Sequence, residues 1–127
     1  MGTPDPPQRR EPQVYRQTRV EFLGEQDGAP ERDLKRELRD AFAEYPGIAQ
    51  AYLALVGYQP ADQKSVALCL VSKVPDDEAV VRRVADIFAR SFGKDVRLDI
   101  IFVDKDQHAD LQRVCQPFFT TPPNEEL

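Results

Sequence analysis

The residues that could bind a metal or act as acids and bases gather late in this chain of 127 residues. His108 is the only histidine, and the sequence provides neither a second zinc ligand nor a base partner at a suitable spacing. The carboxylates of Asp99, Asp104, Asp106 and Asp110 could hold a hard cation, but they do not follow an EF-hand pattern. We therefore expect a solvated His108 in a polar loop beside a solvated strand end, with no catalytic residue, metal or cofactor.

Two cysteines, Cys69 and Cys115, are the remaining candidates for nucleophilic chemistry. Their spacing gives no disulfide framework, and each falls within an expected helix or strand. Burial raises the pKa of a thiol and makes it unreactive, so we expect two buried free thiols in a reducing cytoplasm. An enzyme that uses Cys69 or the late aspartates is a third hypothesis, behind two binding functions.

The stretch from Gly24 to Pro30 is a loop between an expected strand and an expected helix. Backbone amides at the start of a helix can hold an anion, which makes Gly24, Asp27 and Gly28 a candidate ligand loop. The loop matches neither a dinucleotide-binding fingerprint nor a phosphate loop. In ACT-like βαββαβ domains the same loop forms part of an amino-acid site. A regulatory small-molecule sensor is therefore the alternative function, and a simple connector is the other interpretation.

The composition is typical of a soluble single-domain protein. Hydrophobic residues make up 41% and charged residues 31%, and the net charge of −5 lacks the basic footprint of nucleic-acid binders. No apolar run approaches the ~20 residues of a membrane span, and the N-terminal stretch has no secretory h-region. We expect a cytoplasmic protein that binds neither nucleic acid nor membrane. Its expected parts are a disordered Pro-rich tail (1–13), one domain (14–119) and a flexible tail (120–127).

The apolar periodicity predicts the elements that must position these side chains. In chain order they are a strand (14–23), a helix from Pro30 to the stop at Pro46-Gly47, strands (51–56 and 66–71) joined by a polar loop, a helix from the acidic start at 75–78, a strand (96–103) and a short helix (106–115) capped by Asp106. This order predicts an α+β fold. We expect a βαββαβ ferredoxin-like two-layer sandwich with an antiparallel sheet, both long helices on one face and a short C-terminal helix.

The central hairpin, residues 48–74, is the most apolar part of the chain and is apolar on both faces. Such strands are covered on both faces, whereas helices on one side of a sheet cover only one. Tyr52, Ala54 and Val56 on the second face, with Phe118 and Phe119 further on, therefore form a candidate interaction surface. Either the segment over 115–119 folds back over this face or a partner covers it.

The run EYPGIAQAYLALV, residues 44–56, and the later Pro117-Phe118-Phe119 resemble the C-terminal domain of the SseB family. These are bacterial proteins named for enhanced serine sensitivity. The matching positions are Leu34, Leu38, Ile48, 51–53 and 117–118. The family pattern ends in Pro-Phe-Tyr with a basic residue, and Phe119-Thr120 departs from that ending.

The resemblance implies a cytoplasmic bacterial protein with no established enzymatic activity. The family usually carries an N-terminal domain before this one, so we expect a stand-alone version or an excised domain. The leading hypothesis is a non-enzymatic protein-interaction domain, in which a sheet face or edge strand pairs with a protein partner or a second copy.

Overall fold

The computed structural model describes residues 19–59, 63–92 and 98–121. The elements, in chain order, are β1 (Arg19–Glu25), α1 (Ala29–Phe42), β2 (Ile48–Gln59), β3 (Gln63–Ser72), α2 (Glu78–Phe92), β4 (Asp99–Phe102), α3 (Lys105–Gln112) and β5 (Phe119–Thr120). The tail predicted over 1–13, residues 14–18 of the first predicted strand and residues 122–127 lie outside the described ranges. Among the described helices, none is both long and apolar enough to cross a lipid bilayer.

The strands form a mixed five-stranded sheet, which confirms the α+β class and corrects the expected antiparallel sheet. Strand β2 pairs antiparallel with β1 and with β3, but β4 runs parallel to β3. The reason is the crossover helix α2, which returns the chain to the starting end of β3 before β4 begins. Strands β1 to β4 lie in chain order across the sheet, so the ferredoxin-like arrangement is not confirmed.

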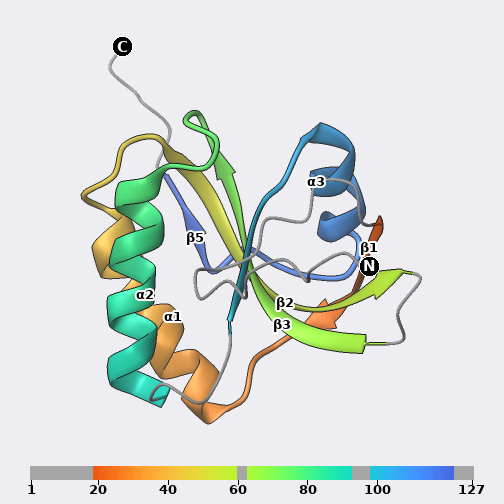
Figure 1. Ribbon diagram of the computed structural model, residues 1–127, viewed down its shortest axis with the longest axis horizontal. Helices are drawn as coiled ribbons and strands as arrows, with labels where there is room; N and C mark the ends of the chain where they lie inside the picture. The colour runs from red at the N-terminus through yellow and green to blue at the C-terminus, as the bar shows by residue number, and fades with distance from the viewer. Residues whose placement is uncertain (1–18, 60–62, 93–97, 122–127) are drawn as a thin grey trace, which may run out of the picture.

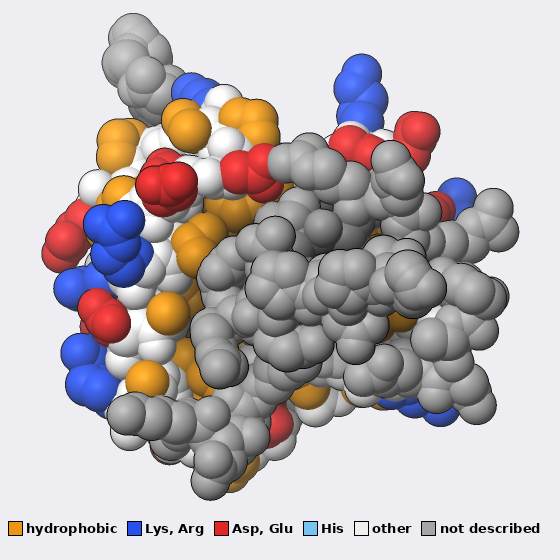
Figure 2. All heavy atoms as spheres, in the orientation of Figure 1, with side chains coloured by type: hydrophobic (Ala, Val, Ile, Leu, Met, Phe, Trp, Pro, Cys, Tyr) orange, Lys and Arg blue, Asp and Glu red, His pale blue; other side chains and the backbone are white. Residues whose placement is uncertain are grey.

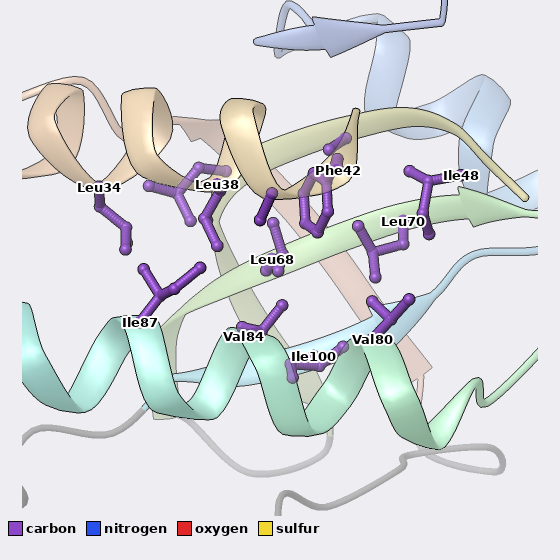
Figure 3. Close-up of a cluster of buried hydrophobic side chains, with 13 residues drawn as sticks. Leu34, Leu38, Phe42, Ile48, Leu68, Leu70, Val80, Val84, Ile87 and Ile100 are labelled. Atoms are coloured by element: carbon purple, nitrogen blue, oxygen red, sulfur yellow. The ribbon is translucent and has the colours of Figure 1, made fainter. Parts of the chain in front are cut away.

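Helices α1 and α2 pack side by side on one face of the sheet (Figure 1). Their apolar stripes recur every three or four residues, so each helix turns one continuous row of side chains toward the strands. In Figure 3 the fully or almost fully buried side chains that meet in this layer are Leu34, Leu38, Phe42, Val80, Val84 and Ile87 from the helices, and Ile48, Leu68, Leu70 and Ile100 from the strands. Each such side chain contributes roughly 1.5–3 kcal/mol relative to an exposed position.

The second face of the sheet is covered by α3, which makes the molecule three layers and not the expected two (Figure 1). Tyr52 of β2, Cys69 of β3 and Ile101 of β4 are buried in one cluster with Leu111 of α3 and with Cys115. The two-sided apolar pattern of the hairpin is explained by this layer. Helix α3 and Cys115, which follows it, cover this second face.

The outer edge of β2 is shared by two strands that lie one beyond the other. Strand β1 pairs with the second half of β2, from Ala54 to Gln59. Strand β5 pairs with Gln50 and Ala51 in the first half, as Figure 1 shows. Paired chain therefore continues through Thr120, where the sequence placed the start of a flexible tail.

Candidate functional site

The candidate ligand loop is occupied by ion pairs within the protein. Gly24 lies at a bulge where β1 shifts register against β2, and Gly28 is the extended N-cap of α1 without a side-chain cap. Between them, Asp27 accepts a hydrogen bond from Nζ of Lys35 at 2.9 Å, and Glu25 accepts one at 3.3 Å. Arg32 also contacts Asp27 at 3.4 Å, so two carboxylates and two cations pair with one another and the loop offers an anionic ligand no excess of positive charge.

The Lys35 hydrogen bond also sets the ionisation of Asp27. It is the largest of the effects that hold the pKa of Asp27 below its usual value of 3.8, with Arg32 contributing further through charge and a weak hydrogen bond. Lys35 itself is buried, with 7% of its side chain exposed, whereas 46% of the Asp27 side chain is exposed. The cluster therefore neutralises a buried ammonium group, which is a structural role.

The structure does not bring the candidate interaction residues onto one surface. Tyr52, Ala54 and Val56 are 0% exposed and lie in the cluster of the second face. Phe118 and Phe119 are half-buried and pack against the other cluster, on the α1 side of the sheet. The three strand residues therefore serve as core, and the part of the proposed surface that stays accessible is the aromatic pair.

Tyr52 and His108 form a contact that sequence reasoning missed. The Tyr52 hydroxyl lies 2.8 Å from Nε2 of His108, and the two rings meet edge to face at 5.5 Å. His108 lies within α3 and is half-buried, so the expectation of a solvated loop histidine is wrong. Burial raises the pKa of Tyr52, which keeps its hydroxyl neutral. The contact pins α3 to the sheet.

The late aspartates are separated by the fold. Asp99 is buried at the start of β4 and accepts a 2.6 Å hydrogen bond from the Tyr58 hydroxyl. Asp104 caps α3, while Asp106 and Asp110 are exposed on that helix. Across the described ranges, no three histidine, cysteine or carboxylate side chains are grouped in a way that could hold a metal ion.

The two thiols are free and buried, as expected. Burial raises the pKa of Cys69 far above its usual value and raises that of Cys115 to about 11. The Cys115 thiol lies 3.5 Å from the backbone oxygen of Leu53, to which it donates. Thiols held in the neutral form are poor nucleophiles, so this geometry favours a packing role for both cysteines.

A groove between the start of α1 and the end of α2 is lined by charged residues that pair with one another. Its lining residues are Pro30, Asp33, Arg36, Glu37, Arg90, Ser91 and Phe92. Arg36 contacts Asp33 at 3.3 Å, and Arg90 contacts Glu37 at 3.7 Å. Acidic and basic side chains are likewise interspersed over the helices in Figure 2. Such a surface has no excess of one charge that would select a ligand.

The edge of β2 next to β5 is a site that already holds an extended peptide segment. The Phe118 amide donates to the Ala51 oxygen at 2.9 Å, and the Thr121 amide donates to the Ala49 oxygen at 2.8 Å. The Thr121 hydroxyl adds a hydrogen bond to the Ile48 oxygen. We refer to the bound residues 117–121 as the C-terminal segment.

Aromatic packing and an arginine complete the contacts of this segment. The ring of Phe42 lies 6.4 Å from that of Phe118 and 5.7 Å from that of Phe119, the second in an edge-on arrangement. Nε of Arg39 donates to the Phe118 oxygen at 3.3 Å. Backbone pairing on one side and aromatic contacts on the other are how sheet edges bind peptides.

The fold defines a small α+β domain in which the edge of β2 holds strand β5. Residues 16–121 match the family model described as the SseB protein C-terminal domain, so the chain belongs to the SseB family. This agrees with the resemblance at Ala51, Tyr52 and the Pro-Phe-Phe run. Comparison with curated proteins and with solved structures gives no match.

Proposed function

We propose that this chain is a non-enzymatic protein-interaction domain that binds extended aromatic segments along the edge of β2. The observation that carries the proposal is the C-terminal segment, which is held there by backbone pairing and by the contacts of two phenylalanines with Phe42. A sheet edge that holds one strand in this way can hold another of the same chemistry.

The bound strand is short, which supports exchange with an external peptide. Strand β5 has only two residues, and Thr120 is exposed. Phe118 and Phe119 are half-buried, whereas the core side chains of α1 are almost fully buried. Each hydrogen bond contributes only about 0.5–1.5 kcal/mol net. The few hydrogen bonds of the segment therefore give a small free energy of attachment, which an external peptide can match.

The residues with reactive side chains support a binding role over catalysis. The two thiols are buried and neutral, and the buried carboxylate of Asp99 accepts a hydrogen bond from Tyr58. His108 contacts the Tyr52 hydroxyl on the second face. Each of these groups has a structural contact: the thiols and Tyr52, which contacts His108, lie in the core of the second face, and Asp99 is hydrogen-bonded to Tyr58.

The cellular setting is part of the same proposal. The resemblance to SseB proteins implies a bacterial cytoplasmic protein. Two free buried cysteines are consistent with a reducing compartment. Fractionation of the source cells tests this setting, and we expect the chain in the cytoplasmic fraction.

A peptide titration tests the proposed function. A fluorescent peptide with the sequence of Gln116–Thr121 is titrated with the full chain and with a Phe119→Ala variant, and polarisation is followed. The chain's own segment competes for the edge, so apparent affinity depends on the fraction of chains whose edge is open. If Phe119→Ala weakens the chain's own segment by about 1.4 kcal/mol, the apparent affinity rises up to tenfold.

Two controls define the outcome. A peptide with serine at both aromatic positions should bind much more weakly, since the contacts with Phe42 are lost. A Val114→Ala variant changes an exposed residue outside the C-terminal segment. This variant should bind the peptide as the parent chain does. Absence of binding to both the parent chain and Phe119→Ala would rule out the proposed function.

A further inference from the structure

We propose that the partner at the β2 edge is a second copy of this chain, and that two copies exchange their C-terminal segments reciprocally. This inference rests on the proposed function, since it names the peptide that the edge receives. The peptide that the structure places at this edge is the chain's own Pro117–Thr121. A second copy carries the same segment and the same edge.

The chain is anchored up to Cys115 and can hinge directly after it. Leu111 is 0% exposed and Cys115 is 4% exposed, so α3 and its following turn stay in the second-face cluster. Gln116 is exposed, and its amide donates at 3.3 Å to the side chain of Glu25. Pro117 has no amide hydrogen to lose, and it favours an extended conformation at Gln116. The hinge therefore lies at Gln116–Pro117.

Exchange replaces each contact of the segment with an identical one. The hydrogen bonds run to β2 at Ile48, Ala49 and Ala51 and to Arg39 of α1, and the aromatic contacts run to Phe42. A second copy presents the same atoms. The two forms therefore differ only in hinge strain and in the freedom lost when two copies associate.

The rest of the sheet does not depend on which copy supplies the segment. The pairings of β1 with β2, β2 with β3 and β3 with β4 leave out residues 117–121. Reciprocal exchange fills both edges, which gives a closed two-fold dimer and no open chain of copies.

The balance between the forms depends on concentration. Because a short linker tethers the segment to its own edge, the effective concentration of the segment at that edge is on the order of millimolar. The exchanged dimer is therefore a minor form at micromolar protein and increases as the concentration approaches that range.

A disulfide trap between copies tests the exchange. Gln50 and Thr120 are opposite each other in the β2–β5 pairing. A tagged Gln50→Cys chain is mixed with an untagged Thr120→Cys chain, and the mixture is held in a glutathione redox buffer. We expect a disulfide-linked heterodimer whose yield rises with protein concentration. An Arg113→Cys chain in place of Thr120→Cys is the matched control, because Arg113 is exposed but lies before the hinge.

Sedimentation velocity of the unaltered chain gives a second measurement that needs no introduced cysteine. We expect a dimer fraction that rises from micromolar to millimolar concentration and is similar in Phe119→Ala, because the closed and exchanged forms contain the same Phe119 contact. A chain that stays monomeric throughout, with no heterodimer above the Arg113→Cys level, overturns the exchange. If the labelled peptide still binds in that case, the proposed function stands and only the second copy as partner is wrong.

Discussion

At the scale of single residues, Lys35 and Asp27 predict how stability depends on acid. The Lys35 hydrogen bond lowers the pKa of Asp27 in the folded state below 3.8, the ordinary value that applies when the chain is unfolded. A carboxyl with a depressed folded pKa stabilises the fold above its unfolded pKa, and this contribution is lost as pH falls through the folded pKa. In Lys35→Met we expect the pKa of Asp27 to return toward 3.8, and stability to fall less on acidification.

NMR titration of the Asp27 carboxyl checks the shift, and urea denaturation at about pH 5 and about pH 2 checks the stability change. Arg36→Met is the control, because Arg36 pairs with Asp33 and not with Asp27. An unchanged pKa for Asp27 in Lys35→Met would contradict the assignment of Lys35 as the main cause.

The thiols predict a chemical readout of burial. Because Cys69 is 0% exposed and Cys115 is 4% exposed, neither should react with a soluble thiol reagent at neutral pH until the chain unfolds. The pKa of Cys115 is raised to about 11, so its neutral form stabilises the fold fully below about pH 9. This contribution is lost as pH rises through about 11.

A time course with the reagent, with and without guanidinium, measures the reactivity. Two thiols should react at once in denaturant and neither should react rapidly in its absence. Fast labelling of one cysteine in the folded chain would place that residue at the surface.

The sequence predicted the free buried cysteines but not the partner of His108. Cysteine burial followed from local pattern, since both residues lie in or beside apolar elements. The Tyr52–His108 contact joins residues 56 positions apart, and the neighbours of His108 are polar. Pairing at that distance depends on where α3 packs, which no local pattern contains.

At the scale of elements, the start of α3 gives a prediction with a built-in control. Asp104 accepts from the Gln107 amide at 2.8 Å, and the Gln107 side chain accepts from the Asp104 amide at 3.0 Å. This capping box satisfies two amides that would otherwise lack partners. We expect Asp104→Ala to reduce the free energy of unfolding by about 1 kcal/mol.

Asp106→Ala is the matched control, because Asp106 is exposed in the first turn and is not the cap. We expect a change within about 0.5 kcal/mol, as for ordinary surface substitutions. Chemical denaturation of both variants decides between the two aspartates, and an equal loss in both would refute the cap assignment.

The sequence prediction that Asp106 caps this helix was wrong, although the correct signal was present. Glutamine stands three positions after Asp104, which is the spacing of a capping box, whereas alanine stands three positions after Asp106. The long elements were better determined. The predicted strands over 51–56 and 66–71 lie within β2 and β3, and the helix predicted from Pro30 corresponds to α1.

Strand β5 could not be predicted, because a two-residue strand carries no periodicity. The parallel direction of β4 was missed for a related reason. Apolar alternation identifies a strand and its two faces but gives no strand direction, which depends on how the preceding helix crosses the sheet.

At the scale of the whole molecule, the third layer accounts for the apolar second face of the hairpin. The sequence showed that this face needed a cover, and two candidates, the segment over 115–119 and a partner, were left open. The cover is α3 with Cys115, while Phe118 and Phe119 pack on the opposite side of the sheet. One stretch of chain near the C-terminal end thus supports both faces.

This arrangement predicts that a single leucine of α3 is as important for stability as a leucine of the main core. Leu111 is 0% exposed on the second face, and Leu38 is 0% exposed on the first. Replacing a buried leucine by alanine removes transfer free energy and leaves a cavity, which together cost about 2–5 kcal/mol. We expect Leu111→Ala and Leu38→Ala to lose stability in this same range. Val114→Ala, at a position 38% exposed, should cost less than about 0.5 kcal/mol.

Urea denaturation of the three variants measures these differences, and the slope of the transition tests whether α3 unfolds with the rest. If Leu111→Ala cost as little as Val114→Ala, α3 would not be the structural cover of the second face. Tyr52 and its neighbours would then return as the candidate interaction surface. A loss equal to that of Leu38→Ala makes the second face part of the folded core, and leaves the edge of β2 as the proposed binding site for a partner.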